Sequence, residues 1–337
     1  MGKLLSICIP SYNMEEYLSR CVDSMLVDEV LDQLEIIIVN DGSKDGTLAI
    51  ANSYKQRYPQ SVVVIDKPNG HYGSCVNASL KIATGKYFRI VDADDWVDRQ
   101  SLVALVNKLE NLDVDCVCTK FSFIFHDNKK KVKEIDVPFD RVLDLNQFMV
   151  PENAVQMHCL TYSMDLIKRI GYTQTEGICY TDMEYVYFML SCARNIYFMD
   201  ASLYQYNFDR DGQSMDNSVV IRNNGHYVTL IKSLEAWHKK DLPFNNNEPN
   251  LYAYVIKFTL TSFALPHYLF YHKYDQEKEV LFRRVYKDLK KSDMLQFPER
   301  HSKRMVEMME LWSQSGLFSL VLKSLYKSMS GLRKSKG

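Results

Sequence analysis

Val91-Asp92-Ala93-Asp94-Asp95-Trp96 places three carboxylates within four positions, at the end of a short run, residues 86–91, that predicts a β-strand. Carboxylates this close repel one another unless a cation lies between them. A hard divalent ion such as Mg²⁺ or Mn²⁺ suits such a site, because it takes oxygen ligands and keeps coordination positions open. Taken alone, the stretch is more simply an acidic turn before a helix, with Asp98 and Ser101 as further N-cap candidates.

Three predicted strand–helix pairs precede this stretch and indicate the fold in which it lies. Hydrophobic runs predict buried strands at residues 4–10, 34–39 and 62–65. Helical patterns follow at about residues 15–26, 48–58 and 75–83. Strand and helix thus alternate four times, which predicts an α/β fold with a parallel sheet and helices on both of its faces.

Polar loops follow three of these strands, at residues 10–13, 40–43 and 92–95. Each loop alone has a structural explanation, since Tyr12 could be a packing aromatic and Asp41 could form an Asx turn. In parallel sheets, however, ligands bind beyond the carboxyl ends of the strands. Three polar loops that meet at one such edge favour a ligand site there.

Composition limits the classes of protein that fit. A length of 337 residues predicts two or three packed subdomains, and a net charge of −1 gives no overall attraction to nucleic acid. The eight cysteines form no paired Cys-x-x-Cys motifs, which argues against structural zinc and suits a reducing compartment. With no signal peptide pattern at Met1 and no run of eighteen apolar residues, we expect a cytoplasmic protein.

Taken together, these motifs resemble those of family 2 glycosyltransferases, which have the GT-A fold. The matching segments are residues 9–13 with 16–18, residues 37–46, the pattern Asn69-Gly70-x-x-Gly73-x-x-x-Asn77, and residues 92–96. The resemblance is close over about residues 4–110 and continues weakly to about 215. It departs from the family at His71-Tyr72, where small residues are more usual.

The resemblance implies a Rossmann-like GT-A domain of the nucleotide-diphospho-sugar transferase type at residues 1–216. Its nucleotide-sugar-binding half would be residues 1–110 and its acceptor half residues 111–216. From residue 217 to 337 the hydrophobic period changes to 3.6, which predicts a C-terminal α-helical region. Helices are expected at about 219–240, 251–273, 276–291 and 299–312, with a kink at Pro266.

The resemblance also assigns roles at the predicted sheet edge. Tyr12 would stack on the base, and Asp41 would accept a hydrogen bond from uracil N3–H, which favours a UDP donor. For the metal ligands, Asp94 is the first choice and Asp92 would contact the metal or the ribose, whereas Asp95 stays unassigned. The residues expected to bind the nucleotide-sugar are Pro10, Ser11, Tyr12, Asn13, Asp41, Ser43, Asn77, Asp92, Ala93 and Arg210.

Two of these expectations concern the diphosphate. Asn77 would lie near the diphosphate or the sugar. Arg210 lies in a loop that resembles the family's flexible loop over the donor, where it would pair with phosphate oxygens, although a surface turn with an exposed arginine is the alternative.

Thr181-Asp182 opens a predicted helix at the place where the family usually carries an acidic motif. Either residue suits the N-cap of that helix, which is a purely structural role. The functional interpretation makes Asp182 the general base on the acceptor hydroxyl, with Glu184 as the second choice. One residue can serve both roles, so the two interpretations stay open together.

The activity that the resemblance implies is an inverting transfer of a hexose or N-acetylhexosamine from a UDP-sugar to a glycan acceptor, free or linked to lipid or protein. A divalent cation, Mg²⁺ or Mn²⁺, would neutralise the departing diphosphate. The setting would be bacterial exopolysaccharide, capsule or glycoconjugate assembly. A catalytically silent glycan-binding or scaffold partner is the alternative, and a dinucleotide-dependent oxidoreductase is disfavoured because no Gly-x-Gly-x-x-Gly follows the first strand.

Two basic segments leave further alternatives open. Residues 317–332 form an amphipathic helical pattern, which predicts either a helix packed on its own domain or one that lies on anionic lipid at the inner face of the plasma membrane. Lys129-Lys130-Lys131 predicts a solvated turn or, less simply, a contact with an anionic acceptor. A monomer and a homo-oligomer are both compatible with the sequence.

Overall fold

The structure of the chain is a computed structural model that describes residues 2–127, 129–154, 156–208, 217–271, 275–292 and 303–314. The chain divides into two compact units. One comprises residues 1–210 with 240–249, and the other comprises residues 211–239 with 250–337. The predicted Arg210 contact and the predicted helix at 317–332 both lie outside the described residues.

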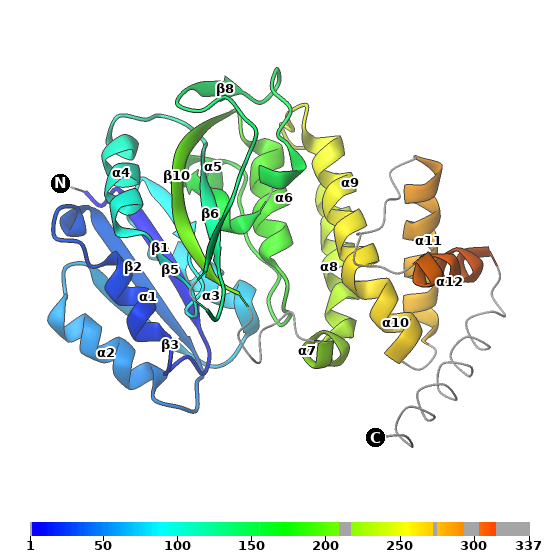
Figure 1. The fold of residues 1–337 in the computed structure, drawn as a ribbon, viewed down its shortest axis with the longest axis horizontal. Coiled ribbons are helices and arrows are strands. Elements are labelled where there is room, and N and C mark those ends of the chain that lie inside the picture. The colour runs from blue at the N-terminus through cyan, green and yellow to red at the C-terminus, as the bar shows by residue number, and fades with distance from the viewer. Residues whose placement is uncertain are drawn as a thin grey trace. The chain divides into compact units, whose positions relative to one another are not determined.

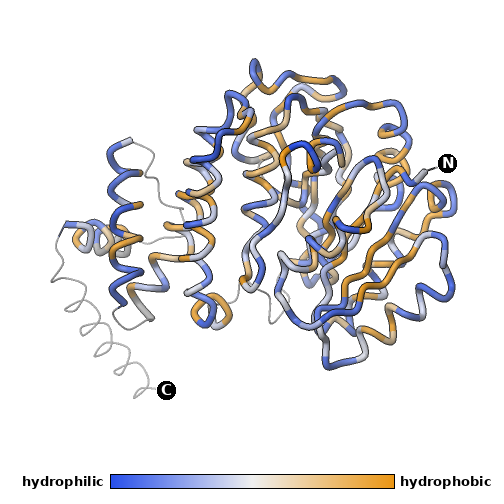
Figure 2. Tube along the Cα trace, turned by 180° about the vertical axis from the view of Figure 1, so that it is seen from behind, coloured by the Kyte–Doolittle hydropathy of each residue, from blue (hydrophilic) through white to orange (hydrophobic). Residues whose placement is uncertain are grey.

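Four parallel strands form one side of the sheet in the first unit (Figure 1). All eight residues of the second strand are buried, as expected for a parallel strand covered on both faces. Figure 2 shows hydrophobic residues gathered along these strands and hydrophilic residues at the turns. In spatial order the strands are β3 (Val62–Lys67), β2 (Leu34–Asp41), β1 (Leu5–Ser11) and β4 (Tyr87–Ile90).

Helices connect these strands, which confirms the predicted α/β alternation. The third helix begins at His71 rather than near residue 75, because Gly70 serves as its N-cap. A short 3₁₀ turn, η1 (Leu31–Gln33), leads into β2. The helices are α1 (Leu18–Met25), α2 (Thr47–Arg57), α3 (His71–Leu80) and α4 (Arg99–Glu110).

The remaining strands make the ten-stranded sheet mixed, so the prediction of a parallel sheet holds only for its first part. The turn before β7 is too short for a crossover, and a short connection of this kind forces an antiparallel pair. The strand β10 runs parallel to β6, whereas β9 runs antiparallel to both β4 and β6. These strands are β5 (Trp96–Val97), β6 (Cys116–Ile124), β7 (Lys130–Lys133), β8 (Val142–Asp144), β9 (Leu160–Ser163) and β10 (Asn195–Asn207).

Short helices fill the connections in this second part of the sheet. The longest of them, α6, is buried over most of its length and therefore belongs to the core. They are η2 (Glu152–Ala154), η3 (Met157–Cys159), α5 (Met164–Arg169) and α6 (Asp182–Cys192).

From residue 217 onward every described regular element is a helix, as the change of period predicts. A π-helical segment, Leu260–Ala264, ends two residues before Pro266, whose missing N–H explains why the regular hydrogen-bond ladder is interrupted there. Among the described residues, no helix combines the length and hydrophobicity that a membrane crossing requires. The helices are α7 (Asn217–Arg222), α8 (Asn224–His238), α9 (Glu248–Thr259), α10 (Leu265–Tyr271), α11 (Gln276–Lys291) and α12 (Lys303–Gln314).

Candidate active site

The acidic stretch forms a tight turn at the carboxyl end of β4. Val91 N–H donates to the Cys8 carbonyl of β1 at 2.9 Å, which continues the sheet by one residue. Asp95 N–H then donates to the Asp92 carbonyl at 3.0 Å and closes the turn. The chain therefore reverses within four residues, and the acidic side chains gather beyond the strand end.

Asp95 is the most deeply buried of the three acids, with 1% of its surface exposed. Its carboxylate accepts hydrogen bonds from the Tyr204 hydroxyl at 2.6 Å and from Asn207 N–H at 2.7 Å. Burial, with the charges of Asp94 and Asp92, raises the pKa of Asp95 well above its usual range. Asp95 has no predicted role, yet the structure places it among the three side chains that could hold a metal ion.

Asp92 accepts a hydrogen bond from the Tyr72 hydroxyl at 2.8 Å. Burial and the Asp94 charge raise the pKa of Asp92 to about 7, and the charge of Asp182 adds to this rise. Tyr72 occupies one of the two positions where the sequence departs from the family pattern. This departure therefore supplies a hydroxyl that holds the Asp92 carboxylate.

His158 completes a group that could hold a metal ion. Each of three side chains, Asp92, Asp95 and His158, offers one possible ligand atom, and these three atoms lie within 4.8 Å of one another. The Nδ1 atom of His158 is buried without a hydrogen-bond partner. Burial and the Arg89 charge lower the pKa of His158 to about 3, so its imidazole is neutral and can donate a lone pair. Two carboxylates and a neutral imidazole suit a divalent ion such as Mn²⁺.

Asp94, the first choice for a metal ligand, is half-buried and lies outside this three-residue group. Its backbone carbonyl accepts a hydrogen bond from Arg20 at 2.9 Å. Its charge nevertheless raises the pKa of both Asp92 and Asp95, which shows that it lies within electrostatic range of them. A role for Asp94 at the metal stays a prediction.

Arg89 is fully buried three residues before Asp92 and braces the histidine segment. Its guanidinium donates to the His158 carbonyl and to the Thr161 hydroxyl, the latter at 2.8 Å. Within the described residues, no carboxylate pairs with Arg89, although a buried charge without a partner is costly. Arg89 therefore fixes η3 against β4 and, with it, the position of His158.

The loops after β1 and β2 meet as predicted. Asn13, which has a positive φ of 54°, donates its N–H to the Ser43 hydroxyl at 3.0 Å. Ser11 pairs in register with Asn40, and Pro10 lies one step earlier on the same strand. The Tyr12 side chain is 46% exposed, so its ring is accessible for stacking. Their contact with a nucleotide stays a prediction.

Asp41 ends β2 and is buried. Its carboxylate accepts hydrogen bonds from Lys67 Nζ and from Gly70 N–H, the latter at 2.9 Å. Asn69 also donates to the Asp41 carbonyl at 3.0 Å. Asp41 thus ties β2 to the loop before α3, and its predicted contact with uracil stays a prediction.

Asn77 ties α3 to the acceptor half. Its side chain donates to the Gln174 carbonyl and to the Glu176 carboxylate, both at 2.9 Å, and accepts from Gln174 N–H at 2.9 Å. These bonds occupy both ends of its amide. Its predicted place beside the diphosphate stays a prediction, and in this structure Asn77 positions the segment that precedes α6.

Asp182 begins α6, after Thr181 at the N-cap position. The Thr181 side chain makes no capping hydrogen bond, in contrast to one of the two predicted capping roles. Burial raises the pKa of Asp182 to about 7, with backbone hydrogen bonds opposing and the Glu184 charge adding to the rise. Its charge also acts on Tyr72 and Asp92, so the structure brings Asp182 close to the acidic turn.

Glu184, the second choice for the base, is fully buried. Its carboxylate accepts from Thr175 N–H at 2.7 Å and from the Thr175 hydroxyl at 2.6 Å. A carboxylate fixed in this way has a structural role. Of the two acids, Asp182 is therefore the better candidate for proton transfer.

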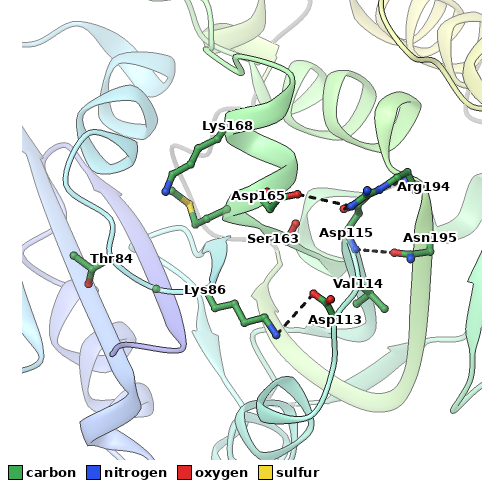
Figure 3. A pocket seen from close by; sticks show the side chains of 12 residues that line it. Thr84, Lys86, Asp113, Val114, Asp115, Ser163, Asp165, Lys168, Arg194 and Asn195 are labelled. Atoms are coloured by element: carbon green, nitrogen blue, oxygen red, sulfur yellow. Dashed lines mark hydrogen bonds and ion pairs between the residues drawn. The ribbon is translucent and has the colours of Figure 1, made fainter. Parts of the chain in front are cut away.

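A polar pocket of about 840 Å³ lies at the opposite, amino end of the strands (Figure 3). Its charged side chains largely neutralise one another. Asp115 binds Arg169 at 2.8 Å and Arg194 at 3.0 Å, and Lys86 lies 4.0 Å from Asp113. The pocket lies away from the acidic turn and contributes none of the candidate residues.

The chain is similar to known proteins in sequence and in fold. Residues 6–171 match the profile of Glycosyl transferase family 2. The minor teichoic acid biosynthesis protein GgaB of Bacillus subtilis (strain 168) is 26% identical over 236 residues, which cover 68% of this chain and 26% of GgaB. The chain thus spans about a quarter of the length of this curated relative.

Two solved structures are similar in fold. S. aureus TarS 1-349 in complex with UDP-GlcNAc matches with a TM-score of 0.54 and 18% identity, over 88% of this chain and 82% of that one. The mannosyltransferase PcManGT from Pyrobaculum calidifontis, in complex with GDP-Man and Mn²⁺, matches with a TM-score of 0.50 and 16% identity, over 99% and 84%. Residues 6–171 are therefore similar to glycosyl transferase family 2, and the first unit of the chain has the GT-A fold.

Proposed function

We propose that this chain is a metal-dependent, inverting glycosyltransferase that transfers a sugar from a UDP-sugar to a glycan acceptor in bacterial cell-surface polysaccharide assembly. The observation that carries the proposal is the group of Asp92, Asp95 and His158 beyond β4, with Asp182 within electrostatic range. Two similar proteins support the donor and the setting, since TarS was solved with UDP-GlcNAc and GgaB is named for teichoic acid.

The three ligand residues would hold a divalent ion. When bound, such an ion neutralises the charge that develops on the departing diphosphate. The protein itself supplies the fixed geometry. Tyr72 and Tyr204 orient the two carboxylates through their hydroxyls, and Arg89 fixes the histidine segment.

Asp182 would act as the general base. The acceptor oxygen forms a bond to the anomeric carbon while the bond from that carbon to the diphosphate oxygen breaks, and the hydroxyl proton passes to the Asp182 carboxylate. A base serves best when its pKa is near the working pH, and the pKa of Asp182 is raised to about 7. One base on the face opposite the leaving group gives inversion.

The nucleotide would lie across the ends of β1 and β2. The exposed Tyr12 ring would stack on the base, and the Asp41 carboxylate, already held by Gly70 N–H, would face uracil N3–H. Ser43 and Asn13, which bond each other, would shape the rim of this site.

The direct test is UDP release from a panel of UDP-sugars, with Mn²⁺, with Mg²⁺ or with a chelator. We expect slow, metal-dependent hydrolysis of at least one donor. The exposed-acid variant Asp165→Asn serves as a matched control that keeps this hydrolysis. Release of UDP from no donor, in a folded protein that still binds glycans, would support the silent-partner alternative instead.

A further inference from the structure

A continuous group of aromatic rings extends from His158 along the carboxyl ends of β6 and β10. The His158 ring lies 5.1 Å from that of Phe121 and 5.0 Å from that of Tyr206. Phe123 continues the group, with ring centroids 5.0 Å from Phe121 and 5.9 Å from Tyr206. Phe208 follows at 5.5 Å from Phe123.

The strand register explains why these rings share one face. In the parallel pair of β6 and β10, Phe121 lies beside Tyr204 and Phe123 beside Tyr206. Residues two apart on a strand project from the same face, so the rows at 121, 123 and 125 extend over about 13 Å. The first row is buried, whereas Phe123, Phe125, Tyr206 and Phe208 are only half-buried.

Two lysines of β7 stand on the same face. The antiparallel register pairs Phe121 with Lys133 and Phe123 with Lys131, and cross-strand partners project from one face. Lys130 pairs with Ile124 and therefore projects from the opposite face.

The nearby acids do not neutralise these lysines. Asp127 pairs with Lys129, and Glu134 pairs with Lys120. Within the described residues, Lys131 and Lys133 take part in no ion pair. This face is thus both aromatic and positively charged, and it begins at a candidate metal ligand.

We infer that this face, defined by Phe123, Phe125, Tyr206, Phe208, Lys131 and Lys133, binds the acceptor as an anionic saccharide or polyol chain. The half-buried rings offer flat apolar surfaces for the C–H faces of the chain units. The lysines provide charge-assisted hydrogen bonds to phosphate or carboxylate groups along that chain. Continuity with His158 would direct the end of the acceptor toward the site of transfer.

This inference rests on the proposed function for its direction, although the binding itself can be tested separately. The probes are oligomers of matched length: poly(ribitol phosphate), hyaluronan and neutral maltooligosaccharide. Their affinity for the full chain is measured by calorimetry at low and high salt. We expect the anionic probes to bind more tightly than the neutral one, with a preference that salt reduces.

Substitutions separate the contributions of charge and rings. The double variant K131A/K133A should weaken binding of the anionic probes by about tenfold and reduce the salt dependence. Phe123→Ala should weaken binding of every probe, by roughly fivefold. Lys130→Ala is the control for position, because it removes one lysine charge from the other face, and it is compared with the single variants Lys131→Ala and Lys133→Ala. Thermal unfolding checks that each variant is folded.

The outcomes decide between distinct conclusions. Binding of poly(ribitol phosphate) alone identifies a phosphate-bearing chain, and binding of hyaluronan alone identifies a carboxylate-bearing one. Equal binding of the neutral probe, binding of no probe, or an equal effect of Lys130→Ala overturns the inference. UDP release from UDP-sugars is measured in parallel, and its absence beside lysine-dependent binding would reject the proposed function while leaving this surface in place.

Discussion

Buried acids at the two edges of the sheet differ in their partners and in the direction of their pKa shifts. At the amino edge, Asp115 has two arginine partners, Arg169 and Arg194, and their hydrogen bonds hold the pKa of Asp115 below its usual range despite burial. At the carboxyl edge, Asp92 and Asp95 have hydroxyl and amide donors, and their pKa values are raised. Asp115 is thus neutralised by arginines of the protein, whereas no cationic side chain among the described residues forms an ion pair with Asp92 or Asp95. We therefore expect Asp92 and Asp95, but not Asp115, to bind a cation from solution.

The largest expected effect tests this contrast at the candidate metal site. Asp92→Asn should lower metal-dependent UDP release by about a thousandfold, because several kcal/mol of charge stabilisation would be lost. Calorimetry should show weaker Mn²⁺ binding in the same variant. Asp94→Ala, measured in the same way, decides whether the neighbouring acid is also a ligand.

Asp115→Asn is the control for that experiment, since it removes a buried acid from the other edge. Mn²⁺ affinity should stay unchanged in this variant. If Asp115→Asn weakened Mn²⁺ binding as strongly as Asp92→Asn does, the distinction between the two edges would be wrong.

The next largest effect concerns Asp182. Asp182→Asn should lower transfer to acceptor by about a hundredfold or more while donor affinity is retained, because only proton transfer is removed. Transfer by the wild-type chain should increase as the pH rises through about 7, since the carboxylate must be ionised to act as a base. Unchanged transfer in the Asn variant, or a flat pH–rate profile, would contradict the assignment.

How much the sequence predicted differs between the two parts of the sheet. From β1 to the turn after β4, each strand leads directly into its polar loop, so the α/β alternation and the meeting of the loops at 10–13 and 40–43 could be predicted locally. The family resemblance rests on the same contiguous motifs.

The second part of the site depends on contacts that are distant in sequence. Tyr204 donates a hydrogen bond to Asp95, which is 109 positions away in the sequence. His158 lies beside them because β9 and β6 lie between β4 and β10 in the sheet. No motif spacing marks His158 as a ligand. An arginine inside the hydrophobic run of β4 was the one signal available, since a buried Arg89 requires acceptors nearby.

A substitution of Arg89 should have an effect of intermediate size. It tests whether Arg89 holds His158 in place beside Asp92 and Asp95. Arg89→Met should weaken Mn²⁺ binding by roughly tenfold, because η3 loses the donor that holds the His158 carbonyl. The measurement is Mn²⁺ calorimetry on the free chain. Arg89→Lys, which keeps the charge but not both hydrogen bonds, should recover only part of the affinity, and full affinity in the Met variant would show that His158 needs no such support.

Asp115→Asn, at the amino edge of the sheet, should have the smallest effect on activity. Its main effect should be on the stability of the fold. Asp115→Asn should lower the free energy of unfolding by about 2 kcal/mol, below the usual range for a broken buried pair because Arg194 is largely exposed. The pKa of Asp115 is depressed in the folded chain, so its stabilisation is present above the unfolded pKa of about 4 and is lost as the pH falls through the folded value. Urea unfolding at neutral and acidic pH should therefore show the wild type and Asp115→Asn converging as the pH is lowered. If the difference in unfolding free energy between the two proteins did not change with pH, the two arginines would not stabilise the ionised form of Asp115. The amino edge would then not differ from the carboxyl edge in how its acids are neutralised.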